Sequence, residues 1–231
     1  MPLATAPIPA DPVAEPRRDS DLSAQALPIS GFGAGTVVTT DDGPVPVEWL
    51  RRGDKVQTFG GGFKPVRWIG RDCLWAEPQQ VPAVRLPVLS GVTEDSPMNP
   101  LIAARHRVVL TGWQVELYFG LESMLVEAKY VSPAQICFPD RATSKASCMH
   151  LLFEAPEIIQ ANGAWVETMQ LSSGATQCLR EDAAEKIDRL DLDLAAHAQP
   201  AMGVMHGWEA QQLGLDLAAM LDCDPLSIAR A

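Results

Sequence analysis

The feature that most constrains this chain is an ordered series of strand and turn signals over residues 31–56. The β-branched residues at 36–40 suit a pleated, half-buried surface. Asp42-Gly43-Pro44 then supplies turn chemistry, and Gly53-Asp54 supplies a second turn. This order predicts a strand, a tight turn, a returning strand with a one-turn helix, and a second turn into another strand.

Short strand signals continue along the chain with turn residues between them. Gly60-Gly61-Gly62 turns the chain, and Pro65 in the following strand predicts a sheet edge or a bulge. Asn162-Gly163, between two apolar pairs, is the strongest hairpin signal. Strands are expected at residues 63–69, 83–89, 101–110, 113–119, 125–131, 149–153 and 157–161. About ten short strands favour one compact all-β fold over alternating strands and helices.

Composition divides the chain into three parts. Residues 1–28 contain six prolines and six alanines without an apolar period, which predicts a disordered leader. Residues 29–175 hold the strand signals and form the expected β domain. Residues 176–231 carry ten acidic and four basic side chains, with apolar residues on helical spacing in two runs. This pattern predicts an acidic tail of two short amphipathic helices.

Charge and cysteine content exclude several function classes. A net charge of −11 disfavours binding to nucleic acids or to anionic membrane surfaces. The chain shows no secretory signal and no apolar run of about 18 residues, so we expect a soluble protein in the cytoplasm, with export without a cleavable signal left open. Five cysteines without a CxxC pair predict isolated thiols rather than a disulfide framework.

Nine residues of the first hairpins match a family pattern. The pattern reads Phe-x-x-Gly-Thr followed by Val-Glu-x-Leu-x-x-Gly-Asp-x-Val, and its residues here are Phe32, Gly35, Thr36, Val47, Glu48, Leu50, Gly53, Asp54 and Val56. It resembles the opening of the Hint domain, the self-processing module shared by inteins and hedgehog C-terminal domains. The resemblance is strongest to a bacterial branch that begins Cys-Phe-x-x-Gly-Thr. It covers residues 28–175 and implies a flat, pseudo-twofold β disc that needs no cofactor.

The resemblance also implies where chemistry would lie. In the family a cysteine at the position of Gly31 attacks the preceding carbonyl and turns an amide into a thioester, and glycine has no side chain to do this. His106, followed by Arg-Val, resembles the histidine that polarises and protonates the scissile amide. Ala-Ala at 103–104 replaces the Ser-Pro of relatives. His150 resembles one of two late histidines, and Pro156 replaces the other.

Three function classes stay open. The first is a Hint-like domain that has lost thioester chemistry and keeps its scaffold. The second is an active self-cleaving domain, at most an autocatalytic enzyme, that uses Ser30 with His106 and His150. The third is an adaptor that binds a protein partner through the helical tail.

The same residues also have simpler interpretations. Ser30 is an ordinary residue ahead of a strand, and each histidine is a buried polar group bonded to backbone. A metal site from Cys148-x-His150 and the distant His106 is not expected, because no second close ligand pair exists and residues on opposite pleats face opposite ways.

Overall fold

The computed structural model describes residues 31–74, 83–86, 100–131, 135–136, 146–171 and 181–213. The expected leader, Ser30, the last three residues of the strand expected at 83–89 and the tail beyond Leu213 lie outside the described residues. Strands dominate the described part of the chain, so the predicted all-β fold is confirmed. No helix in this part is long and apolar enough to span a bilayer.

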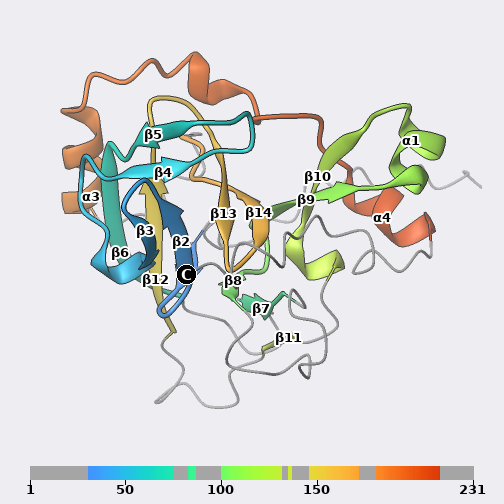
Figure 1. The fold of residues 1–231 in the computed structure, drawn as a ribbon, viewed down its shortest axis with the longest axis horizontal. Helices are drawn as coiled ribbons and strands as arrows, with labels where there is room; N and C mark the ends of the chain where they lie inside the picture. Colours follow the sequence, from blue (N-terminus) through green and yellow to red (C-terminus); the bar gives the residue numbers. More distant parts are fainter. Residues whose placement is uncertain are drawn as a thin grey trace, which may run out of the picture.

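The described strands form two sheets (Figure 1). Within each sheet, neighbouring strands pair in antiparallel orientation. The first sheet has the order β11-β7-β8-β1-β12-β6 and contains β1 (Phe32–Gly33), β6 (Trp68–Leu74), β7 (Ala83–Arg85), β8 (Leu101–Ala103), β11 (Gln135–Ile136) and β12 (Ala146–Leu152). The second has the order β10-β9-β14-β13-β2-β4-β5, with β3 paired to β2, and contains β2 (Val37–Thr40), β3 (Gly43–Pro46), β4 (Lys55–Gln57), β5 (Phe63–Pro65), β9 (Arg107–Thr111), β10 (Ser123–Glu127), β13 (Ile158–Ala161) and β14 (Ala164–Glu167).

The described helices are short and lie at the periphery of the sheets. They are α1 (Trp113–Phe119), α3 (Glu181–Asp188) and α4 (Gly207–Leu213), with single 3-10 turns at η2 (Val47–Trp49), η3 (Ala128–Tyr130) and η4 (Ala196–Ala198). Figure 1 shows α3 beside β6 and, at the opposite end, α1 and α4 near β9 and β10. Ile187 of α3 is buried against a cluster that includes Leu152 and Met169, so this apolar stripe packs on the β domain.

Residues 31–56 form the predicted series of strands and turns. β2 pairs with β3, η2 is the expected one-turn helix, and β4 follows. Gly35 has a φ of +83°, and its N–H donates to both carboxylate oxygens of Glu48 at 3.1 and 2.9 Å. Asp54 accepts a hydrogen bond from the Arg51 N–H at 2.8 Å. The matched glycine and acidic residues therefore build turns.

The predicted hairpin turn at Asn162-Gly163 and the predicted sheet edge at Pro65 are both confirmed. Asn162 and Gly163 both have positive φ, +48° and +92°, and they join β13 to β14 with Ala161 opposite Ala164. Pro65 ends β5, which lies at the edge of its sheet. The chain then enters the other sheet as β6, so the single strand expected at residues 63–69 is two strands.

The strand expected at residues 113–119 is wrong, because this segment is the helix α1. Gly112 turns the chain at a φ of +113°, and Gly120 closes the helix in the left-handed conformation with its N–H bonded to the Glu116 carbonyl. Val115 is the one buried side chain of α1. A single buried position in seven suits a short helix in the β9–β10 connection better than a half-buried strand.

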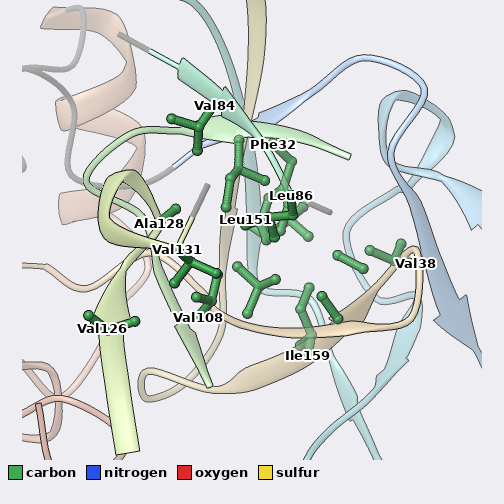
Figure 2. Packing of buried hydrophobic residues seen from close by; sticks show 14 of the residues in the cluster. Phe32, Val38, Val84, Leu86, Val108, Val126, Ala128, Val131, Leu151 and Ile159 are labelled. Carbon is green, nitrogen blue, oxygen red and sulfur yellow. The ribbon is translucent and has the colours of Figure 1, made fainter. Parts of the chain in front are cut away.

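The two sheets share a core. Figure 2 shows Phe32 and Leu151 of the first sheet packed near Val108 and Ile159 of the second. The chain crosses from the first sheet to the second after β1, after β8 and after β12. These crossings bring residues that are far apart in the sequence together at the junction of the sheets.

Candidate functional site

Gly31 is buried immediately before β1, at the junction of the sheets. Its carbonyl accepts a hydrogen bond from the Ala103 N–H at 2.9 Å. β1 lies between β8 and β12, with Gly33 opposite Cys148. The strands on both sides therefore fix the backbone of Gly31.

Cys148 fills the space beside Gly31. Its sulfur lies 1.8 Å from the point where a β-carbon on Gly31 would stand, a distance close to a carbon–sulfur bond length. Cys148 is fully buried and carries a thiol, not a disulfide. Any side chain at position 31 would collide with this sulfur, so only glycine fits unless Cys148 moves.

His106 lies on the other side of the Gly31 amide. It follows the turn after β8 and is 1% exposed, and its ring packs edge-on against Phe32 at 4.6 Å between centroids. Nε2 is in hydrogen-bond contact with the carbonyl oxygen of Glu167, and Nδ1 lies 3.3 Å from the Gly31 nitrogen and 3.2 Å from the Gly31 carbonyl oxygen. A neutral imidazole has one donor and one acceptor. If Nε2 donates to Glu167, Nδ1 is left to accept the Gly31 N–H.

Burial keeps this imidazole neutral. Desolvation lowers the pKa of His106 from 6.5 to about 4, outweighing the hydrogen bonds to Glu167 and Gly31 that raise it. The charges of His150 and Arg107 lower the pKa further. At neutral pH His106 therefore faces Gly31 as an uncharged base.

A buried ion pair supports the carbonyl that His106 contacts. Arg107 Nε lies 2.6 Å from Oε2 of Glu167, and Oε1 accepts the Ala201 N–H at 2.8 Å. Burial raises the pKa of Glu167, and the neighbouring Arg107 lowers it. The pair ties β14 to β9 and to the chain that follows α3.

His150 lies on the same side of β12 as Cys148. The two are two residues apart and therefore share a face of the strand, contrary to the expectation that they face opposite ways. Cε1 of His150 lies 3.5 Å from the point where a β-carbon on Gly31 would stand. The side chains of His106, His150 and Cys148 thus surround Gly31.

The structure brings the three predicted site residues together and adds others. Ser30 lies outside the described residues. The sequence alone indicates no more for Cys148 than an idle thiol or a metal ligand, although its spacing to His150 places both residues on one face of a strand. The role of Glu167 had no signal in the sequence, because it acts through its backbone carbonyl. Within the described ranges, no three His, Cys, Asp or Glu side chains could hold a metal ion.

The family model described as the Hint domain matches residues 30–173, which is more than half of the chain. The crystal structure of the gp41-1 intein is similar at 13% identity over 61% of this chain and 98% of the intein, with a TM-score of 0.27. No curated protein matches the chain. The family match covers both the strands that hold Gly31 and those that hold the two histidines, and the chain belongs to the Hint domain family.

Proposed function

We propose that this Hint domain no longer cleaves its own backbone by the thioester route and retains the scaffold of a self-processing module. In this proposal Gly31 stands at the position of the family's cysteine nucleophile. The supporting observation is the Cys148 sulfur, which occupies the space that a side chain at position 31 would need. The surroundings of Gly31 have therefore adapted to a residue that cannot attack a carbonyl.

The state of His106 supports the same proposal. A general acid must carry a proton that it can give to the leaving nitrogen. The lowered pKa of His106 keeps the ring neutral, and when Nε2 donates to Glu167 the Nδ1 atom carries no proton for the Gly31 nitrogen. The resting geometry thus offers neither a nucleophile at position 31 nor an acid for the departing amine.

Intact-mass spectrometry tests the proposal. The full chain is purified and held at neutral pH with and without dithiothreitol or hydroxylamine, which would trap a thioester. We expect only the full-length mass under every condition. A fragment that begins at Gly31 would overturn the proposal. The double variant Gly31→Cys/Cys148→Ala is the matched positive control, because it returns a thiol to position 31 and removes the sulfur that blocks it.

A second candidate is surviving self-cleavage with the sulfur supplied by another strand. It is favoured by one observation: the Cys148 thiol and the His106 imidazole flank the Gly31 amide. The Cys148 thiolate would attack the carbonyl carbon of residue 30. The bond to the Gly31 nitrogen would break as that nitrogen takes up, through the neighbouring His106 imidazole, the proton that the Cys148 thiol lost. Water would then hydrolyse the resulting thioester and return the thiol.

The same mass measurement separates the routes. Cleavage that disappears in Cys148→Ala identifies Cys148 as the nucleophile. Cleavage that persists in Cys148→Ala but disappears in Ser30→Ala identifies the serine route. His106→Gln is expected to slow either route, since both need a group beside the Gly31 nitrogen.

A further inference from the structure

A pocket away from Gly31 collects an unusual share of the positive charge of this acidic chain. It has a volume of about 660 Å³ and lies where α3 meets the β domain. Its basic side chains are Arg51, Arg52, Arg67, Arg71, Lys186 and Arg189, and none of the described residues that line it is acidic. The whole chain has 18 lysines and arginines and a net charge of −11. A third of its cations thus line one pocket, which we call the basic pocket.

Three separate segments build the basic pocket. Arg51 and Arg52 lie in the turn between η2 and β4, and Arg67 and Arg71 lie just before and within β6. The last two cations come from α3 and the residue after it. Ile187 holds this helix against the β domain through a buried apolar contact. The cations are therefore positioned by folded structure and not by one flexible run of basic sequence.

The charges of the basic pocket are only partly compensated. Arg67 pairs with Glu154 at 3.3 Å, and Arg189 pairs with Glu185 at 3.4 Å. Arg71 donates to a backbone carbonyl, which carries no net charge. Arg51 and Arg52 form no ion pair with any residue that the structure describes. Arg51, Arg52 and Arg71, half of the cations of the basic pocket, thus form no ion pair within the described residues.

One buried donor also lacks a partner. Nε of Arg67 is inaccessible to solvent and forms no hydrogen bond within the described part of the chain. A buried donor without an acceptor is costly. Clustered cations also repel one another, so a purely structural role would place carboxylates among them. An anion in the pocket would relieve the repulsion, and a shift of the Arg67 side chain toward it would give the buried Nε an acceptor.

The remaining lining is apolar. Leu50, Trp68, Ile69 and Leu190 complete the described lining. Trp68 lies against Gly70, where an added β-carbon would come within 2.1 Å of the indole ring. This contact fixes the indole in place. A fixed aromatic side chain beside arginines suits a ligand with an apolar or aromatic part as well as anionic groups.

We propose that the basic pocket binds an organic molecule that carries two adjacent phosphate groups. Arginine forks match phosphate oxygens in pairs. One phosphate monoester carries a charge of about −1.5 to −2, so two phosphates match the unmatched charge better than one. The size of the pocket leaves room for an organic part against Trp68, Ile69 and Leu190, within the range of ordinary ligand sites.

Isothermal titration calorimetry on the full chain tests this inference with three probes. Inorganic pyrophosphate supplies the two phosphates alone, adenosine diphosphate adds an organic part, and citrate supplies a similar charge as carboxylates. We expect adenosine diphosphate to bind most tightly, pyrophosphate next and citrate most weakly. Binding should weaken as salt increases, because added ions screen the attraction. The absence of binding by either phosphate probe at millimolar concentration would overturn the site.

Matched variants place the binding in the pocket. Arg51→Gln/Arg52→Gln removes two exposed cations that form no described ion pair, and we expect about a tenfold loss of affinity. Lys55→Gln/Lys64→Gln makes the same change in net charge outside the pocket and should leave affinity unchanged. Equal losses in both variants would show nonspecific attraction and overturn the site. If citrate binds as tightly as pyrophosphate, the pocket does not select phosphate groups. If adenosine diphosphate and pyrophosphate bind with equal affinity, the pocket does not contact an organic part of the ligand.

Discussion

Cys148 and Gly31 share one space: the sulfur of Cys148 lies 1.8 Å from where a β-carbon on Gly31 would stand. The sizes of the two residues are therefore coupled. Gly31→Ala is expected to lower the free energy of unfolding by about 1–3 kcal/mol, the usual cost of overpacking a core. Urea unfolding monitored by tryptophan fluorescence measures this loss.

The double variant tests the coupling directly. Cys148→Ala removes the sulfur but keeps a β-carbon, which lies 3.5 Å from the new atom at position 31, an ordinary contact. Gly31→Ala/Cys148→Ala should therefore lose less stability than the sum of the two single variants. Additive losses would show that the two residues do not compete for space.

Stability should fall as the solution becomes acidic. The pKa of His106 is about 4 in the folded chain and 6.5 when the ring is exposed, so between these values the unfolded chain binds more protons. The free energy of unfolding should drop through this window by about 3 kcal/mol from His106 alone. Unfolding in urea at a series of pH values measures the slope.

His106→Gln is the control for this slope. The variant should show a weaker pH dependence between pH 6.5 and 4. Some dependence should remain, because burial also lowers the pKa of His197 and acts in the same direction. The raised pKa of Glu167 acts in the opposite direction in both proteins. Equal slopes in the wild type and His106→Gln would contradict the buried, neutral state of His106.

Removing the Glu167 side chain should be among the most damaging single changes. Glu167→Ala leaves Arg107, 13% exposed, without its partner at 2.6 Å and leaves the Ala201 N–H without an acceptor. The expected loss is about 3–5 kcal/mol, typical of a broken buried pair. Lys64→Ala removes the more exposed pair with Glu157 and should cost about 1 kcal/mol or less. Thermal and urea unfolding of the two variants should differ accordingly, and similar losses would contradict this contrast.

The turn at Asn162 should tolerate aspartate better than alanine. Asn162 has a φ of +48°, and its side-chain oxygen accepts the Val37 N–H. Asn162→Ala loses both the acceptor and the tolerance of this backbone conformation, so we expect a loss of about 1–2 kcal/mol. Asn162→Asp keeps an acceptor and should lose less. An equal loss in both variants would show that the bond to Val37 contributes nothing.

Local chemistry made much of the fold predictable. The turn at residues 162–163 and the edge position of Pro65 follow from rules that act over a few residues, and both were confirmed. The helix at residues 113–119 could not be separated from a strand by composition, since its aromatic and branched residues also suit strands. In the structure, Gly112 and Gly120 stand at the two ends of this helix and limit it to one short segment.

The candidate site was predictable only as a set of positions. A sequence can match Gly31, His106 and His150 to a family pattern, but it cannot show that a sulfur from β12 fills the space beside Gly31. That contact depends on the register of β1 against β12, which is set by packing between distant strands. The basic pocket could not be predicted either, because its cations come from three separate segments of a chain with net negative charge.

Glu48 connects the turn after β1 to the basic pocket. Its carboxylate holds the Gly35 amide, in the turn that follows β1, while its backbone carbonyl accepts a hydrogen bond from Arg71 in the wall of the basic pocket at 2.6 Å. A molecule that draws the Arg71 guanidinium away must exchange this bond for its own. Any change in the turn at Gly35 that accompanies this exchange would in turn alter the affinity of the basic pocket, because linkage is reciprocal.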